Sequence, residues 1–488
     1  MKLIKFLTSS SFNKILLIYS VLIFFGTLTG YIFKLFPHNT VANIMPGIAP
    51  HLDIGKPYVD YWDVYPPGIY LFYYVFFLIG RDIFLSYSIL HFLILFGTIY
   101  LGFKIYQYIS NQYLIFVIGL SYFLSPLYMH YLLPNELIGL FFSFLGLYIY
   151  LKNTESTINI IAGNFFLIYS AFIKEIFAAS AFCIILYQIF TKDYRNLRFS
   201  IFGILFQFFL IYTYIFNLSI VDDVIKSYEY KYSLFNIEEL LKTNYLYLVI
   251  AIFLFFIFKF LQYKQIIHQI KFDIKKSYVI YLYSIFMILS FLILNRDDGG
   301  HFDIPKIFPI FFLLSVLLLV KNQKLYLISS ILIILISGYV LKFQHATYSY
   351  LLIQPQFNYV EKSYIHYIDT EISSSIEESN SSFLYLYGWG STNYYYELKI
   401  KPYSKYWIIN PQILVNEQII ELKNDISSRP PRIIYYCGFD EGCPAGFDFK
   451  KFENDFIDFK KLIEACYIDI NNDYYELTEP NCVNDINF

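Results

Sequence analysis

The sequence predicts an α-helical polytopic membrane protein that carries a small extracytoplasmic α/β domain at its C-terminal end. Of its 488 residues, 57% are hydrophobic and only 15% are charged, against roughly 25% charged residues in a typical soluble domain. Uncharged segments recur along residues 1–344, many of them about 18 to 25 residues long, the length that a helix needs to cross a hydrocarbon core of about 30 Å. Residues 345–488 are markedly more polar.

The N-terminal segment is expected to remain as the first membrane helix. It reads MKLIKFLTSSSFNKILLIYSVLIFFGTLTGYIF, with a basic flank, an apolar stretch too long for a signal peptide and no small-residue cleavage site. In all, we identify apolar segments at residues 12–36, 66–80, 83–105, 113–131, 133–151, 156–173, 175–191, 197–216, 243–263, 277–295, 304–320 and 324–342.

Lysine and arginine in short loops predict the orientation of the spans. The N-terminus and the links 192–198, 259–276 and 321–324 are basic, which places them in the cytoplasm. If all twelve segments crossed, the 192–198 link would lie outside, against its charge. Segment 66–80 is short and begins with Pro66-Pro67, so we interpret it as a helix along the membrane surface. Eleven spans then remain, with the N-terminus inside, the C-terminus outside and an external loop at 37–82.

This topology sorts the acidic residues of the membrane part by side. Only Glu155, Asp193 and Asp273 fall inside, and the other fourteen fall outside. Because acidic residues contribute little to orientation, the asymmetry is independent of the topology argument. It predicts an external, acid-lined site, on which four segments converge: the loop 37–82 and residues 129–136, 172–177 and 295–306.

Two of these segments carry ionisable residues close to apolar helices. Lys174 and Glu175 lie at a turn between two such helices, where charges usually face a partner or a polar cavity; the alternative is a mutually neutralised structural pair. Arg296, His301 and Lys306 surround a Gly-Gly turn and suit a phosphate group, or they belong to a solvated connecting loop.

Several classes of partner and cofactor receive no support from the sequence. Neither a P-loop nor a Rossmann glycine fingerprint is present, and no basic tract indicates a nucleic acid partner. No compact ligand spacing identifies a metal site, so we assign no metal ligands and no certain cofactor, although the external carboxylates leave one divalent cation open. Because an external site lacks cytoplasmic nucleotide sugars, an activated sugar donor there must be carried on a lipid.

The first loop resembles a known family. The stretch GKPYVDYWDVYPPGIYLFYYVFFLIGRD is similar to the first-loop signature of the polytopic GT-C glycosyltransferases, and more closely to glycosyltransferase family 39, which includes protein O-mannosyltransferases and lipid A aminoarabinose transferases. The matching features are Gly55, Tyr58, Asp60, the Pro66-Pro67 pair with its short helix, and Arg81. HFDIPKIFP resembles the family's late H-Y-x-x-P element, and LYLYGWGSTNYYYELKIKPYSKYW and SSRPPRIIYYCG resemble its external α/β domain.

The resemblance implies a GT-C fold and transfer of a sugar from a polyprenyl-phosphate donor to an external acceptor. An acidic side chain acts as general base, for which we favour Asp60, then Asp53 and Asp63. Basic groups hold the donor phosphate, and a third set lines the acceptor cavity. The phosphate set is Arg81, Lys174, Arg296, His301 and Lys306, and the cavity set is His38, Asn39, Tyr58, Tyr65, Asn135, Glu136 and Glu175.

The chain departs from the family pattern at two positions. His38 and Asn39 stand where the family has its key acid, and Tyr65 replaces the lysine before the paired prolines. An alternative function from another class is a transporter or flippase of lipid-linked saccharide, and a third is a polymerase or ligase of surface polysaccharide. Charges on one external face favour transfer, whereas charges in the middle of the spans would favour transport. The acceptor is not identified.

Residues 345–488 are expected to form the extracytoplasmic α/β domain. FLYLYG and RIIYYC predict strands, and NEQIIELKNDI and FIDFKKLIEA predict amphipathic helices. Cys437, Cys443, Cys466 and Cys482 lie in this domain, which indicates either up to two disulfides in an oxidising compartment or four reduced thiols. We therefore expect an integral protein of the bacterial cytoplasmic membrane, with its active site and C-terminal domain outside.

Overall fold

The computed structural model describes the chain in parts, and these parts belong to two compact units. The described residues are 20–21, 24–25, 28, 50, 55–60, 66–78, 83–109, 135–215, 218–233, 274–294, 382–386, 395, 400–406, 416–436, 453–471, 474–479 and 482–483. The first unit is Met1–Pro37, Ile79–Ile211 and Asn236–Gln356, and the second is His38–Leu78, Tyr212–Phe235 and Phe357–Phe488.

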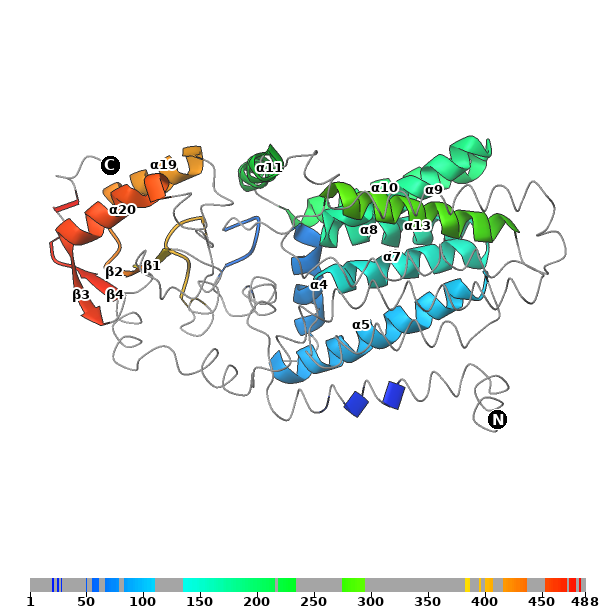
Figure 1. Cartoon of the computed structure of the whole chain (residues 1–488), viewed down its shortest axis with the longest axis horizontal. Coiled ribbons are helices and arrows are strands. Elements are labelled where there is room, and N and C mark those ends of the chain that lie inside the picture. Colours follow the sequence, from blue (N-terminus) through cyan, green and yellow to red (C-terminus); the bar gives the residue numbers. More distant parts are fainter. Residues whose placement is uncertain are drawn as a thin grey trace, which may run out of the picture. The chain divides into compact units, whose positions relative to one another are not determined.

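The described part of the first unit is a bundle of helices (Figure 1). Helix α7 packs between α5 and α8, and α9 packs against both α8 and α13. Each of these helices coincides closely with one of the apolar segments expected from the sequence. Their bounds are α5 (Ile83–Tyr106), α7 (Asn135–Lys152), α8 (Thr157–Ile173), η2 (Glu175–Phe177), α9 (Ala178–Phe190), α10 (Tyr194–Tyr214) and α13 (Ile274–Leu294).

Helices α7 and α8 approach each other at two glycines. A Cβ atom added to Gly146 would lie 2.6 Å from the carbonyl oxygen of Gly163, and one added to Gly163 would lie 2.9 Å from Cβ of Tyr150. Both distances are well inside van der Waals contact. The absence of side chains therefore sets the spacing of the two helices.

Gly146→Ala is expected to destabilise the bundle by about 1–3 kcal/mol, because the added methyl group meets backbone atoms that cannot move independently. Thermal unfolding of the detergent-solubilised protein measures the loss. Ile158→Ala on α8 is the control, since this side chain is 77% exposed. Equal unfolding temperatures for Gly146→Ala and the wild type would show that the helices are not held at this spacing.

Two helices in the described part of the chain are long and apolar enough to be candidate membrane spans. They are Ile89–Tyr106, within α5, and Tyr194–Tyr214, which is α10. At 1.5 Å per residue, a 21-residue helix such as α10 is about 31 Å long, which matches the hydrocarbon core. Helix α10 also exposes Phe202, Leu205 and Phe209. The number of spans and their orientation stay predictions of the sequence.

Among its described residues, the second unit contains helices α4 and α11 from the membrane part of the sequence. Helix α4 (Pro67–Phe77) lies within the segment for which we expect a surface helix. With 11 residues it is about 16 Å long, too short to cross a bilayer as a single straight helix. Pro67 occupies its first position, where the missing N–H costs no hydrogen bond. Helix α11 (Leu218–Ser233) falls in the predicted external link between residues 216 and 243.

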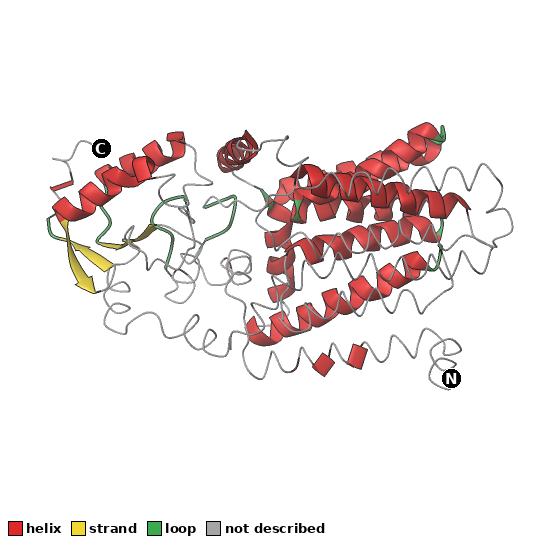
Figure 2. Cartoon of the chain, in the orientation of Figure 1, coloured by secondary structure: helices red, strands yellow, loops and turns green. Residues whose placement is uncertain are grey.

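The C-terminal part of this unit has the expected α/β composition (Figure 2). A four-stranded sheet has the order β1-β2-β4-β3, in which β1 pairs parallel with β2 and the other pairs are antiparallel. The elements in this part are β1 (Phe383–Leu386), α19 (Asn416–Ser428), β2 (Ile433–Tyr436), α20 (Glu453–Cys466), β3 (Tyr467–Asn471) and β4 (Tyr474–Leu477).

One disulfide joins Cys466 to Cys482 in the described residues. The oxidising compartment of this part of the chain stays a prediction. Cys437 and Cys443 lie outside the described residues. Cys183, in α9, is buried and forms no disulfide.

Candidate functional site

The segment Gly55–Asp60 forms a closed turn that presents one carboxylate. The backbone N–H groups of Val59 and Asp60 donate to the carbonyl oxygen of Lys56, at 3.1 and 2.9 Å. In return, the N–H of Lys56 donates to Oδ2 of Asp60 at 2.7 Å. Gly55 has φ 135°, a conformation that other residues rarely adopt. The turn is therefore closed by backbone hydrogen bonds to Lys56 and by the Asp60 carboxylate, and Asp60 stays exposed.

Tyr58 anchors this turn to helix α4. Its ring lies 6.1 Å from that of Tyr70, centroid to centroid, and only 1% of the residue is exposed. Its φ is 63°, a left-handed conformation that costs a tyrosine of order 1 kcal/mol and persists only when the surroundings impose it. Burial against α4 accounts for this conformation. A cavity-lining role for Tyr58 stays a prediction.

Lys56 links the same turn to the end of helix α10. Its Nζ donates to the carbonyl oxygen of Tyr214 at 2.9 Å and lies 4.1 Å from the centroid of the Tyr214 ring. Burial lowers the pKa of Lys56, and the nearby Asp60 carboxylate offsets part of that shift. The ammonium group is thus held by a specific partner rather than directed freely into solvent.

The Asp60 carboxylate is both oriented and accessible, and its assignment as the general base stays a prediction. It is exposed, and one of its two oxygens is held by a backbone N–H, so the carboxylate is oriented and yet accessible to an incoming hydroxyl group. The other residues predicted around it lie outside the described residues: Asp53, Asp63, His38, Asn39, Tyr65 and Arg81.

A second group of predicted site residues meets in the helix bundle of the first unit, which we call the helical unit. Nζ of Lys174 lies 3.2 Å from Oε1 of Glu136, and both side chains are buried. Glu136 is in the first turn of α7, where the helix dipole favours negative charge. Lys174 is the extended residue between α8 and η2. Glu136 and Lys174, one from each of two predicted external segments, thus meet in an ion pair that sequence spacing did not specify.

Two further predicted residues adjoin this pair. Asn135, directly before Glu136, is 2% exposed, and its Oδ1 accepts no hydrogen bond from the described part of the chain. Glu175 follows Lys174 and begins the short helix η2. The predicted phosphate ligands Arg296, His301 and Lys306 lie outside the described residues. A donor phosphate that used Lys174 would have to share it with Glu136.

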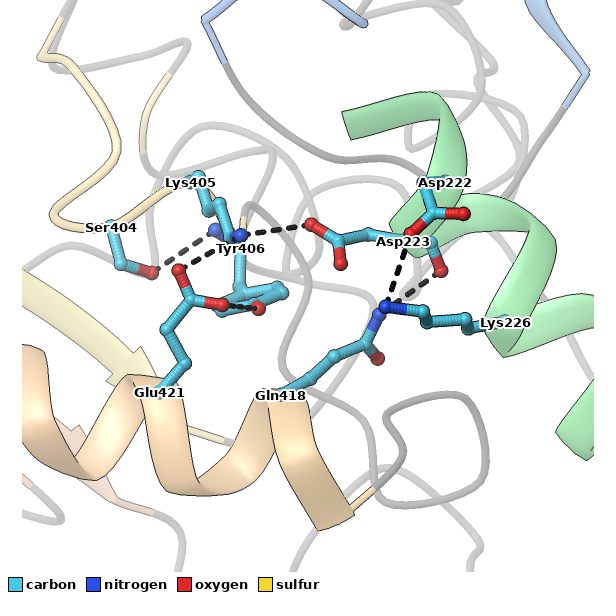
Figure 3. A network of polar contacts seen from close by, with 8 residues as sticks. All are labelled: Asp222, Asp223, Lys226, Ser404, Lys405, Tyr406, Gln418 and Glu421. Atoms are coloured by element: carbon cyan, nitrogen blue, oxygen red, sulfur yellow. Dashed lines mark hydrogen bonds and ion pairs between the residues drawn. The ribbon is translucent and has the colours of Figure 1, made fainter. Parts of the chain in front are cut away.

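A third polar cluster joins α11 to the C-terminal domain (Figure 3). Nζ of Lys405 lies 2.8 Å from a carboxylate oxygen of Asp223 and 2.8 Å from one of Glu421. The hydroxyl group of Tyr406 donates to Glu421 at 2.7 Å. Nε2 of Gln418 donates to the backbone carbonyl of Asp223 at 3.0 Å. We call these five residues the α11 clamp.

The pKa shifts in the α11 clamp follow from these contacts. Burial alone would lower the pKa of Lys405, but its bonds to Asp223 and Glu421 outweigh burial and raise it. Burial alone would raise the pKa of Glu421, but Lys405 and Tyr406 outweigh it and lower the value. Burial and the Glu421 carboxylate both raise the pKa of Tyr406. The clamp is thus electrostatically satisfied at neutral pH, which indicates a structural role.

Asp223→Asn is expected to weaken the docking of α11 by about 1–3 kcal/mol, the usual cost of leaving a partly buried charge less well paired. Faster hydrogen exchange of the backbone amides in α11 measures this effect. Asp222→Asn is the matched control. Asp222 directly precedes Asp223 and is exposed. The ion pair shown for it is with Lys226 on the same helix, at 3.0 Å. Equal exchange in the two variants would contradict the assigned role of the clamp.

The structure brings into view residues that were not singled out from the sequence. Lys405, Gln418 and Glu421 are separated from Asp223 by nearly two hundred residues, and Tyr214 by 158 from Lys56. No sequence signal marks such pairs in advance. Among the described residues, no group of three or more His, Cys, Asp or Glu side chains is arranged to hold a metal ion.

Comparison with family models, curated proteins and solved structures finds no match to this chain. The case for a function consequently depends on the residues described above and on the resemblance of the first loop.

Proposed function

We propose that this protein is a membrane glycosyltransferase that moves a sugar from a polyprenyl-phosphate donor to an external lipid, glycan or protein acceptor. One observation carries the proposal. Most of the predicted first external loop, His38–Leu78, belongs to the same compact unit as Tyr212–Phe235 and the C-terminal residues Phe357–Phe488, whereas the predicted external segments 129–136, 172–177 and 295–306 belong to the other unit. The predicted general base therefore belongs to the unit that the topology places outside the membrane.

In this proposal Asp60 removes the proton from the acceptor hydroxyl group as that oxygen attacks the anomeric carbon of the donor sugar. The bond between that carbon and the phosphate oxygen breaks, and the polyprenyl phosphate leaves. Cations near the leaving group stabilise its charge, a role proposed for Arg81, Lys174, Arg296, His301 and Lys306. In the same proposal the protein lies in the bacterial cytoplasmic membrane, with eleven spans and a GT-C fold.

The second candidate function is transport of a lipid-linked saccharide. It is favoured by the buried pair of Glu136 and Lys174, which lie 3.2 Å apart within the helical unit. Ionisable groups buried among membrane helices commonly mark a transport pathway. Against this reading, the pair lies at the end of α8 and the start of α7 rather than in the middle of either helix.

Transfer of radiolabelled sugar tests the two functions. Membranes containing the full-length protein are supplied with a panel of polyprenyl-phosphate sugars, and separately with nucleotide sugars. Labelled acceptor formed only from the lipid-linked donors supports the transferase. Movement of a labelled lipid-linked saccharide between leaflets of proteoliposomes, without formation of a labelled acceptor, would support the transporter instead.

A further inference from the structure

We propose that Lys56 is a positioning residue, which fixes the turn carrying Asp60 to the C-terminal end of helix α10. Its catalytic consequence rests on the proposed function, whereas its structural consequence does not. The first-loop resemblance assigns no role to this lysine.

The contact with α10 has two components that favour an ammonium group. Tyr214 is the last residue of α10, so its carbonyl oxygen is one of the four that lack a partner within the helix. Nζ of Lys56 donates to it at 2.9 Å. The same ammonium group lies 4.1 Å from the Tyr214 ring centroid, within the range of a cation–π interaction. Lys56, which is not part of α10, therefore caps the C-terminal end of that helix, where the helix dipole favours a cation.

The backbone of the same residue holds the carboxylate. The Lys56 N–H donates to Asp60 at 2.7 Å, and the Lys56 carbonyl accepts from Asp60 and Val59. One residue thus binds Asp60 through its main chain and α10 through its side chain. The ammonium group is accordingly committed to a carbonyl and a ring, which distinguishes it from a cation that is open to a donor phosphate.

Positioning the general base and binding the donor phosphate would have different effects on the kinetics. A residue that places the general base affects the rate of the chemical step, because a misplacement of about 1 Å can cost about a hundredfold in rate. A residue that holds the donor phosphate affects donor binding as well. Lys56→Met removes the charge and keeps most of the aliphatic stem. Lys56→Arg keeps a cation that can still reach a carbonyl and a ring.

The first measurement is hydrogen exchange of the amides in residues 55–60 in the full-length protein in detergent. Lys56→Met is expected to speed this exchange about ten- to hundredfold, the range given by loss of one hydrogen bond from a charged group. Tyr214→Leu, which removes the ring but leaves the carbonyl, is expected to have a smaller effect in the same direction. Lys56→Arg is expected to restore most of the protection. Tyr212→Leu is the matched control, because Tyr212 lies in the same last turn of α10 and is 62% exposed.

The second measurement is the kinetics of sugar transfer. Lys56→Met is expected to lower kcat with little change in the KM for the donor. Adding Tyr214→Leu to it is expected to cause no further loss, because the two residues act through one contact. Unchanged exchange in Lys56→Met would overturn the proposal, and so would a raised donor KM with unchanged kcat, which would make Lys56 a donor ligand. If the wild type transfers no sugar, the proposed function fails, and the exchange data still decide whether Lys56 holds the turn.

Discussion

Asp60→Asn is expected to slow sugar transfer by about 10²- to 10⁴-fold, the range that a positioned general base contributes. The expectation follows from the turn around Asp60. Asparagine keeps an oxygen that can accept the hydrogen bond from the Lys56 N–H, now 2.7 Å from Oδ2 of Asp60. The turn therefore keeps its shape while the side chain loses its ability to take a proton, so the substitution separates chemistry from folding.

The measurement is the initial rate of transfer from the lipid-linked donor that the panel identifies, at saturating donor and acceptor. Asp222→Asn serves as the control for removing an exposed carboxylate of the same unit, since the Asp222 side chain is 63% exposed, and it is expected to transfer at the wild-type rate. Hydrogen exchange across residues 55–60 shows whether Asp60→Asn has left the turn intact.

An intact turn with an undiminished rate would exclude Asp60 as the base. Asp53→Asn and then Asp63→Asn would become the decisive variants, in the order that the sequence suggests. An undiminished rate in all three would show that this chain does not take its base from the first loop, where His38 and Asn39 already depart from the family pattern.

Positions of the helices could be predicted from the sequence because hydrophobic segments of the right length are visible without knowledge of their partners. The apolar segment 83–105 became α5 (Ile83–Tyr106), and 156–173 became α8 (Thr157–Ile173). The start of α8 also has a local signal, since Oγ of Ser156 accepts from the Asn159 N–H and caps the helix. A helix end that is determined by a nearby capping residue can therefore be predicted from a single sequence.

Contacts between distant segments could not be predicted in this way. The sequence predicts that Lys174 faces a partner or a polar cavity, or that it neutralises Glu175, but it does not identify Glu136, with which Lys174 forms an ion pair. A charge pattern specifies only that an opposite charge is available, and the external side of this chain offers many carboxylates. Helix α11 was likewise treated as part of an external link, because its docking depends on Lys405 and Gln418, far along the chain. The contact of Lys56 with Tyr214 likewise joins residues 158 apart in the sequence.

Breaking the ion pair between Glu136 and Lys174 is expected to destabilise the helical unit by about 3–5 kcal/mol, the usual cost of leaving one charge of a buried pair uncompensated. Both side chains are nearly inaccessible, with 5% of Glu136 and 10% of Lys174 exposed. Lys174→Met and Glu136→Gln each remove one charge. Unfolding of the detergent-solubilised protein measures the loss, and Glu155→Gln, which alters an exposed acid, is the control.

The double variant Glu136→Gln with Lys174→Met is expected to recover much of the lost stability, because it removes both charges of the pair together. This recovery separates a structural pair from a functional one. Full stability in the double variant together with lost transfer or transport would show that the pair acts on the substrate. Single variants as stable as the wild type would mean that the pair is not buried in the folded protein.

The two single variants, Lys174→Met and Glu136→Gln, are expected to lose different amounts of stability. In Lys174→Met the remaining Glu136 carboxylate lies in the first turn of α7, where the helix dipole contributes about 0.3–1 kcal/mol in favour of negative charge. In Glu136→Gln the remaining Lys174 ammonium group lies beside the same positive helix end, which disfavours it. Glu136→Gln should therefore be the more destabilising variant, and the opposite order would show that Lys174, rather than Glu136, has the better supporting environment.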